Sequence, residues 1–446
     1  MEKQKKKMPQ TRMLAIGFAA MIIIGAVLLM LPIAHKGEGS VSFLDALFTS
    51  TSASCVTGLV VADTFQNWTL FGQLVILGLI QVGGLGFITI GVYIAVLFKK
   101  RIGLSQREAI HESINTIEIA GVVRLTRKII KGTFLFEGIG AVLLAIRFVP
   151  QKGLVKGIYY SIFHAISAFC NAGFDLMGDT EAYSSLVAYE SDWIVNLTIM
   201  GLIVIGGLGF IVWDDLYRNG LHFKRYLLHT KIVLSATLLL TIVPAVLFLI
   251  SERNTVFADM TVSERILGAL FSAVTPRTAG FNTVDTGSLS EAGKLMTIIL
   301  MFIGGSPGST AGGIKTTTFV VMILSAIAAI RSTYGTNVFG RRLEEDTIRK
   351  AATVFMINLG LAAIAATAIM FCHELPFEDV LLEVFSAIGT VGMSAGITRE
   401  LSVVPRCILI LLMYCGRLGS LSFALSFARK RIIPPVQNPV EKIVVG

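Results

Sequence analysis

The sequence predicts an all-α polytopic membrane protein in which four tandem copies of one helical unit surround a central axis. Only 15% of the 446 residues are charged and 54% are hydrophobic, whereas soluble globular domains carry roughly 25% charged residues. Long apolar runs recur from one end of the chain to the other, and a short apolar stretch with a glycine turn occurs four times between them. A chain with so little polar surface needs lipid as its second solvent.

Eight apolar runs are long enough to cross a bilayer, which takes about 20 residues of helix. They are 14–34, 69–98, 132–150, 193–213, 232–251, 295–330, 351–372 and 407–428. The third run contains Glu137, the sixth is interrupted by glycines, and the eighth carries Arg417. No small-residue cleavage site follows the first run, so we expect it to remain as a spanning helix.

Basic residues cluster at the N-terminus and in every second connection between these runs. The connection 173–192, by contrast, has five acidic residues and no basic one. The positive-inside rule therefore predicts a multi-pass protein of the cell membrane with both termini in the cytoplasm. An excess of acidic residues on the outer side would concentrate cations at an entrance there.

Composition also argues against other classes of protein. The five cysteines show no paired motif, and the six histidines are scattered, which predicts neither a disulfide framework nor a metal site. The positive charge is explained by topology and does not indicate nucleic-acid binding. An intramembrane enzyme would need clustered ionisable groups, and those of this chain are single and dispersed, so we expect no catalytic residues.

Each of the four outer connections contains a Ser-Ala pair followed by a loop glycine. The serines are Ser52, Ser167, Ser272 and Ser386, and the glycines are Gly58, Gly173, Gly280 and Gly392. The separation is six residues in three copies and eight in the third. A second glycine landmark follows and begins at Gly83, Gly206, Gly304 and Gly416. Two landmarks in register predict a repeat of helix, short re-entrant helix, glycine loop and helix.

Non-helical backbone at membrane depth is tolerated only where it is buried in protein or lines a watery cavity. Four such loops predict one cavity on a pseudo-fourfold axis, where carbonyl oxygens replace the hydration shell of a cation. The predicted filter residues are Val56, Thr57, Gly58, Asn171, Ala172, Gly173, Thr278, Ala279, Gly280, Thr390, Val391 and Gly392. The alternative is a set of re-entrant packing loops in a transporter without a filter.

The sixth run contains five glycines and one proline within ten residues. Each glycine costs a helix about 1 kcal/mol and the proline about 3 kcal/mol. We therefore predict an intramembrane loop that obstructs the pore below the filter; the alternative is a permanent kink for helix packing. The predicted gate residues are Gly304, Gly305, Ser306, Pro307, Gly308, Ser309, Thr310, Ala311, Gly312, Gly313 and Arg417.

Arg417 falls where the first and second copies have Gly84 and Gly207. A charge at the bilayer centre costs at least ~2.5–3.5 kcal/mol if it faces lipid. We expect Arg417 to face the pore, to repel cations and to donate hydrogen bonds to the glycine-rich loop. The alternative is a buried pair with a carboxylate such as Glu137.

Three further polar residues have simpler interpretations. Lys315 is expected to extend to the cytoplasmic surface. Arg277 is expected to brace its own loop by hydrogen bonds to backbone carbonyls. His164 is expected to pack within its short helix without binding a ligand.

From about residue 14 to 430 the chain resembles the Trk/Ktr/HKT superfamily of potassium transporters, and it is most similar to the bacterial KtrB-type membrane subunit. The segments 275–282 (TPRTAGFN) and 304–315 (GGSPGSTAGGIK) carry the resemblance. In that family the four loop glycines line a potassium filter and the second segment is a gate. Gly58, in place of the serine found in sodium-preferring members, favours potassium. No loop matches the Thr-Val-Gly-Tyr-Gly of potassium channels, which predicts a less strict selectivity.

The resemblance implies potassium uptake by the ion-translocating subunit of a Ktr-type system. It also implies a homodimer on a cytosolic ring of KtrA-type RCK regulatory subunits, which would bind ATP or ADP. This chain itself would carry K⁺ as its transported ion and no covalent cofactor. A sodium or ammonium conductor on the same scaffold remains the alternative.

The expected organisation has cytoplasmic ends and four units. The divisions are 1–13 for the N-terminus, 14–131, 132–231, 232–350 and 351–430 for the units, and 431–446 for the C-terminus.

Overall fold

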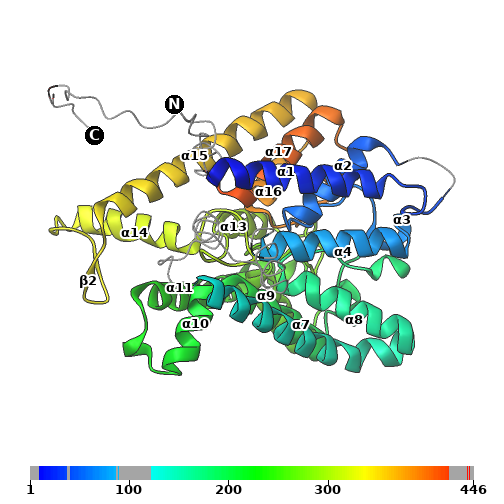
Figure 1. The fold of residues 1–446 in the computed structure, drawn as a ribbon, viewed down its shortest axis with the longest axis horizontal. Helices are drawn as coiled ribbons and strands as arrows, with labels where there is room; N and C mark the ends of the chain where they lie inside the picture. Colours follow the sequence, from blue (N-terminus) through cyan, green and yellow to red (C-terminus); the bar gives the residue numbers. More distant parts are fainter. Residues whose placement is uncertain are drawn as a thin grey trace, which may run out of the picture.

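The computed structural model describes residues 10–37, 41–86, 89, 122–420, 439 and 441. This part of the chain is mostly helical (Figure 1), which agrees with the predicted class. Its only sheet is a two-stranded antiparallel hairpin of β1 (Asn337–Val338) and β2 (Arg341–Arg342). The termini 1–9 and 442–446 and most of the basic connection 99–131 lie outside the described residues.

Four long helices, which we call the outer helices, are long and apolar enough to cross a membrane. They are α1 (Gln10–Leu29), α7 (Val122–Lys152), α11 (Leu228–Ser251) and α15 (Glu345–Cys372). Three of them contain a predicted run in full, and α1 covers the run 14–34 as far as Leu29. The run with Glu137 lies in α7, which is 31 residues long. Because α7 begins at Val122, the predicted boundary at residue 132 falls inside a helix.

Four short helices follow the outer helices, and each packs against the outer helix that precedes it. They are α2 (Phe43–Ser54), α8 (Leu154–Phe169), α12 (Val262–Val274) and α16 (Phe377–Gly389). Side chains cap the starts of two of them. The Ser42 hydroxyl accepts a hydrogen bond from Asp45 N, and Thr261 and Glu264 form a capping box. Such caps satisfy the free N–H groups of the first turn.

Four inner helices complete the units. They are α4 (Leu70–Leu85), α9 (Trp193–Leu208), α13 (Glu291–Phe302) and α17 (Val403–Leu418). Three of them end at a glycine with positive φ, namely Gly86, Gly209 and Gly419. The prediction of one continuous span over 193–213 was wrong, because the chain bends by 94° between α9 and α10 (Phe210–Asn219). A backbone with φ of 93° at Gly209 cannot continue a right-handed helix.

After α13, the chain leaves helical conformation until α14 (Thr316–Ile330). The loop between them, residues 303–315, is called the crossing loop below. The remaining short elements are α3 (Thr64–Asn67), η1 (Met177–Asp179), η2 (Val187–Tyr189), η3 (Phe223–Arg225), η4 (Glu252–Asn254) and η5 (Ile397–Arg399).

The four sets of helices close into a ring. Each inner helix packs on the short helix of the next set: α4 on α8, α9 on α12, α13 on α16, and α17 back on α2. The last contact joins the C-terminal part of the chain to its N-terminal part. All four short helices therefore lie inside one bundle, with the loops that follow them near a common axis.

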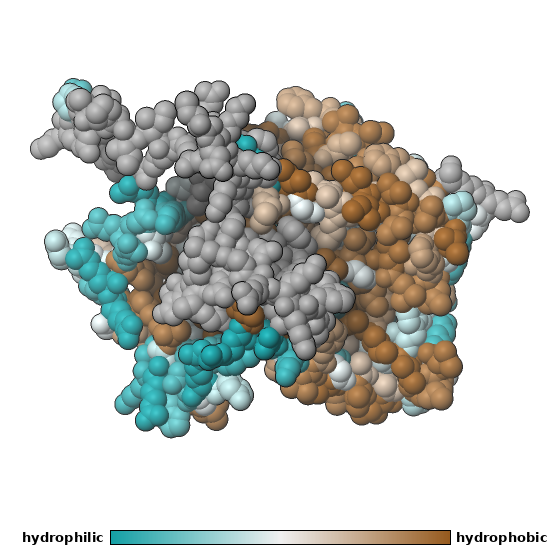
Figure 2. Space-filling model, in the orientation of Figure 1, coloured by the Kyte–Doolittle hydropathy of each residue, from teal (hydrophilic) through white to brown (hydrophobic). Residues whose placement is uncertain are grey.

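The surface of the bundle is apolar over the outer helices. Ile24, Phe134, Val142, Leu239 and Ile364 are all more than half exposed. In Figure 2 hydrophobic residues cover much of the right-hand part of the molecule, and hydrophilic residues gather at its left end near α10 and the end of α14. A broad apolar surface on several long helices is that of a multi-pass membrane protein.

Candidate ion pathway

The four loop glycines form a closed ring. A Cβ atom added to Gly58 would lie 2.5 Å from Ala172 O, one added to Gly173 would lie 2.8 Å from Ala279 O, and one added to Gly280 would lie 2.5 Å from Val391 O. One added to Gly392 would overlap Thr57 O. Each glycine thus lies against the carbonyl that precedes the next glycine, and the fourth returns to the first. We call this arrangement the glycine ring.

All four loops share an uncommon backbone conformation. The residue two positions before each glycine has positive φ: Val56 57°, Asn171 59°, Thr278 70° and Thr390 51°. The glycines themselves have φ between 69° and 97°. Left-handed conformation costs a non-glycine residue roughly 1–2 kcal/mol. Strain repeated at four equivalent positions indicates that the conformation serves a function. No residue pattern predicted it, since neither valine nor threonine favours positive φ.

Hydroxyl groups of the short helices hold three of the loops, and they belong to the serines of the Ser-Ala pairs. Ser52 Oγ accepts a hydrogen bond from Gly58 N at 3.0 Å, and Ser386 Oγ accepts one from Gly392 N at 3.0 Å. Ser167 Oγ donates to Phe174 O at 2.7 Å. These side chains link the end of each short helix to the loop that it carries.

In the third loop a threonine takes the place of the serine. No hydrogen bond of the Ser272 side chain to its loop is recorded among the described residues, whereas Thr275 Oγ1 donates to Phe281 O. Ala279 N also donates to Thr275 O at 2.9 Å. Thr275 therefore holds the third loop in the way that the serines hold the other three. The spacing of eight residues in this copy, against six in the others, was the available signal.

Acidic residues line the cavity directly outside the glycine ring. This outer cavity has a volume of about 160 Å³ and is lined by the four glycines, Asp63, Asp175 and Asp285 among others. Asp175 lies two residues after Gly173, and burial close to Asp63 and Asp179 raises its pKa to about 7. The sequence indicated Asp175 only as one of the acidic residues of the connection 173–192. Its position in the outer cavity follows from the path of the chain after Gly173.

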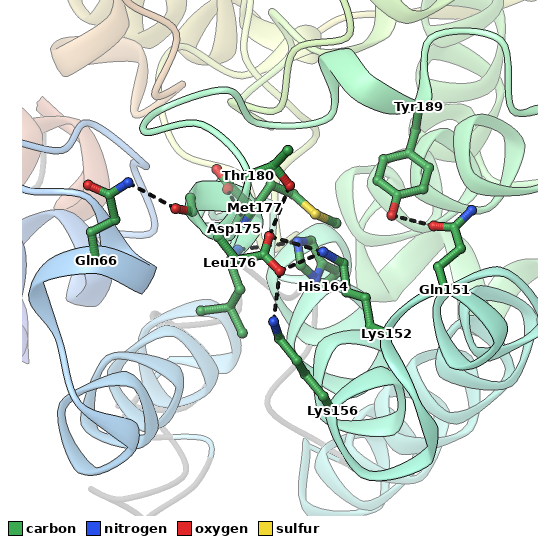
Figure 3. A network of polar contacts seen from close by, with 12 residues as sticks. Gln66, Gln151, Lys152, Lys156, His164, Asp175, Leu176, Met177, Thr180 and Tyr189 are labelled. Carbon is green, nitrogen blue, oxygen red and sulfur yellow. Dashed lines mark hydrogen bonds and ion pairs between the residues drawn. The ribbon is translucent and has the colours of Figure 1, made fainter.

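The loop that carries Asp175 is held by polar contacts with α7 and α8 (Figure 3). Lys152 and Lys156 donate to Asp179 Oδ2 at 2.7 and 2.8 Å, and these contacts lower the pKa of Asp179. His164 Nε2 lies 3.4 Å from Leu176 N and His164 Nδ1 lies 2.7 Å from Tyr160 O. His164 is therefore a buried structural residue, as expected from the sequence.

The crossing loop docks on the second unit. Ser306 N donates to Gly207 O at 3.0 Å and Thr310 N to Gly206 O at 3.3 Å, while Phe210 N donates to Gly308 O at 2.8 Å. A Cβ atom added to Gly312 would overlap the Thr390 side chain. The loop thus lies against the loop of the glycine ring on one side and the bend of the second inner helix on the other.

Arg417 joins the crossing loop to the first unit. Its guanidinium donates to Thr310 O, Gly83 O and Gly84 O, the last at 3.0 Å. The alternative pairing with Glu137 is contradicted, because Glu137 accepts a hydrogen bond from Gln81 Nε2 at 3.0 Å. Landmark residues from all four units therefore meet at the crossing loop.

Two other cations differ from expectation. Lys315 does not extend to the surface, because its Nζ donates to Ala311 O at 2.7 Å and to Gly312 O at 3.3 Å within the crossing loop. Arg277 donates to the Thr237 hydroxyl at 3.3 Å in place of a backbone carbonyl of its own loop.

A second cavity lies on the other face of the crossing loop. It has a volume of about 270 Å³ and is lined by Gly84, Ser309, Ala311, Lys315 and Arg417 among others. Within the described part of the chain, no group of three His, Cys, Asp or Glu side chains is placed to hold a metal ion.

An apolar helical bundle with two polar cavities, separated by the glycine ring and the crossing loop, is the architecture of a membrane transport protein. The family model described as "TrkH: Cation transport protein" matches residues 3–433. The chain belongs to this family, and it is a transporter and not an enzyme.

Relatives cover nearly the whole chain. It is 44% identical to the Ktr system potassium uptake protein B of Bacillus subtilis, over 94% of this chain and 93% of that protein. It is 40% identical to the potassium/sodium uptake protein NtpJ of Enterococcus hirae, over 99% and 98%. The crystal structure of the potassium transporter TrkH from Vibrio parahaemolyticus superposes with a TM-score of 0.74 at 17% identity, covering 96% of this chain and 87% of that one. That likeness supports the fold.

Proposed function

We propose that this chain carries potassium into the cell, as the ion-translocating subunit of a Ktr-type uptake system. The observation that carries the proposal is the glycine ring with its repeated positive φ at residues 56, 171, 278 and 390. Four loops of one conformation around one axis would present backbone carbonyls to a dehydrated cation. The name of the Bacillus subtilis relative, a potassium uptake protein, supports potassium as that cation.

In this proposal the four sets of helices are the M1–P–M2 repeats, and the short helices are re-entrant pore helices. The filter residues are the three that end at each ring glycine: Val56 to Gly58, Asn171 to Gly173, Thr278 to Gly280 and Thr390 to Gly392. The cyclic contacts of inner helices with the next short helix support a pseudo-fourfold pore. The divisions near residues 131, 231 and 350 and the cytoplasmic placement of both termini belong to the same proposal.

The gate consists of residues 304–313 and Arg417. The crossing loop lies between the two cavities, and Arg417 donates to its Thr310 carbonyl. The positive charge would repel a cation that has passed the ring, and a glycine-rich loop can rearrange at small free-energy cost. The loop and the arginine together would close the path at rest.

The regulatory partner is a cytosolic RCK ring of the KtrA type that binds ATP or ADP, on which the chain sits as a homodimer. Support comes from two relatives whose names place them in a Ktr system. A chain purified as a stable monomer, with regulated flux in the absence of any partner, would contradict this part.

Sodium conduction is the second candidate. The Enterococcus hirae relative is named for both potassium and sodium uptake, and no loop of this chain has the Thr-Val-Gly-Tyr-Gly sequence. An ammonium conductor on the same scaffold has no observation that favours it over potassium.

Growth of a bacterium that lacks its own potassium uptake tests the proposal. Expression of this chain with its partner should restore growth at low potassium, and expression of Gly392→Ser should not, although it reaches the membrane in equal amount. Growth that is restored only when sodium is present would favour the second candidate. Failure of wild-type protein to restore potassium accumulation would contradict the proposed function.

A further inference from the structure

An open apolar groove on the side of the bundle has no part in the ion pathway described above. It has a volume of about 500 Å³ and lies between α7, the end of α9 and α10. Its walls are mainly apolar and aromatic, with Leu135, Phe136, Ile205, Leu208, Phe210 and Trp213 among them. Leu135 on its rim is 60% exposed, so the groove opens onto the membrane-facing surface of α7.

A basic stripe marks one end of this groove. Arg124, Arg127, Lys128 and Lys131 are spaced at i, i+3, i+4 and i+7 on α7 and therefore lie on one face, and all four are exposed. Lys128 and Lys131 line the groove itself.

The nearest carboxylate does not neutralise this stripe. Asp214 pairs with Lys128 at 2.6 Å and also with Arg218 at 2.6 Å. No ion pair of Lys131 with any described residue is recorded. The mouth of the groove therefore keeps an excess of positive charge.

The chemistry of the groove identifies its ligand. Apolar walls open to the bilayer fit an acyl chain, and a cationic mouth fits a phosphate. Trp213 and the 82% exposed Tyr217 lie at the same end, where aromatic side chains mark the level of the headgroups. We propose that the groove binds an anionic phospholipid of the bilayer, with its phosphate on Lys131 and one acyl chain along Leu135 and Ile205.

The groove is connected to the crossing loop by one residue. Phe210 lines both the groove and the inner cavity, and its N–H donates to Gly308 O at 2.8 Å. Phe210 follows directly after the 94° bend between α9 and α10. A lipid against α10 would therefore stabilise the crossing loop in the position seen here, and loss of the lipid would release it.

Native mass spectrometry of the full-length protein, with its partner where the complex is stable, tests the binding. Wild-type protein should retain phosphatidylglycerol in preference to phosphatidylcholine. Lys131→Gln should weaken retention about fivefold, the usual contribution of one lysine at an anionic surface, and Lys131→Arg should restore it. Arg331→Gln, which removes a cation from the end of α14, is the matched control and should retain the lipid.

Filling the groove gives an independent test. Leu135→Trp should lower retention, whereas Ile139→Trp, one turn along the same face of α7 and 49% exposed, should not. Equal retention by wild type and both groove variants, or no preference for phosphatidylglycerol, would overturn the proposal. Wild-type protein that binds neither lipid would mean that something else, such as residues 87–121 of the chain, fills the groove, and this would overturn it too.

Cation flux in vesicles tests the connection to the loop. Replacing phosphatidylglycerol with phosphatidylcholine should raise flux through wild-type protein, and the same change should leave the flux of Lys131→Gln unaltered. Identical lipid dependence in both proteins would overturn the connection. Because binding is measured without transport, failure of the proposed potassium function would not affect the binding result.

Discussion

The glycine ring and the crossing loop lie in contact, yet they are built on opposite principles. The ring takes the same backbone conformation from each of the four loops, with positive φ at the glycine and two residues before it. The crossing loop comes from the third unit alone, and the guanidinium that binds it comes from the fourth alone, through Arg417. One layer is symmetric and the layer beside it is not.

Under the proposed function, the difference follows from what each layer would do. A cation that has lost its water needs oxygen atoms on all sides, which four equal loops provide. A gate needs two arrangements of similar free energy, and a single irregular loop held by a few hydrogen bonds can exchange one set of partners for another. Strain is shared in the ring, whereas the crossing loop is held by contacts with partners from different units.

The largest expected effect comes from breaking the ring. In Gly392→Ser the new side chain would overlap Thr57 O at a residue with φ of 97°. We expect the preference for potassium over sodium to fall by about tenfold or more, which is about 1.4 kcal/mol. Competition flux in liposomes measures it. Gly360→Ser, where a Cβ atom meets no other atom within 4 Å, is the control; equal loss in both would contradict the filter.

Removing the contacts between Arg417 and the crossing loop should change potassium flux and leave the selectivity unchanged. Arg417→Ala removes the donors to Thr310 O, Gly83 O and Gly84 O. Without a partner we expect potassium flux to rise on the order of fivefold, the lower range for coupling between sites. Deletion of residues 306–312 should act in the same direction. Unchanged or lower flux from well-folded protein would mean that the loop is a structural kink.

Titration of Asp175 should affect uptake less. Its pKa of about 7 makes it mainly neutral below pH 7 and charged above it, so its attraction for cations is lost as the pH falls through 7. The change should stay below about fivefold, since a charge 4 Å away in water contributes about 1 kcal/mol. Flux measured against external pH should lose this step in Asp175→Asn.

A matched variant keeps the Asp175 prediction specific. Asp63, Asp285 and Arg399 share the outer cavity with Asp175, and Asp179 lies nearby in the same loop. Asp285→Asn should lower uptake slightly at every pH and retain the step near pH 7. If the step persists in Asp175→Asn, another group of the protein is responsible for it.

The smallest expected effect is a loss of stability when a hydroxyl group that holds a loop of the glycine ring is removed. Ser52→Ala removes the acceptor of Gly58 N and should lower stability by about 1 kcal/mol, the usual contribution of one hydrogen bond. Thr275→Ala should do the same for the third loop, because Thr275 donates to Phe281 O. Ser272→Ala should leave the thermal unfolding temperature in detergent close to that of the wild type. A larger loss for Ser272→Ala than for Thr275→Ala would reverse our assignment.

The sequence by itself determined the membrane class, the outer helices and the location of the loop glycines. These features are local: helices need long apolar runs, and a tight loop needs glycine at positive φ, so both leave a mark in neighbouring residues. The interruption near residue 304 was also predictable, because clustered glycine and proline cannot hold a continuous helix.

Tertiary structure alone decided how these parts meet. Arg417 binds Gly83 O and Gly84 O, which lie 334 and 333 residues away in the chain, and the residue after the sharp bend at Gly209 donates to Gly308 O in the crossing loop. The sequence left a pairing of Arg417 with Glu137 open as an alternative, and it assigned no hydrogen bond to Thr275. The contacts that form could not be predicted from the sequence, because a hydrogen-bond partner is set by which atoms lie within 3 Å or so after packing, and spacing along the chain does not encode that distance.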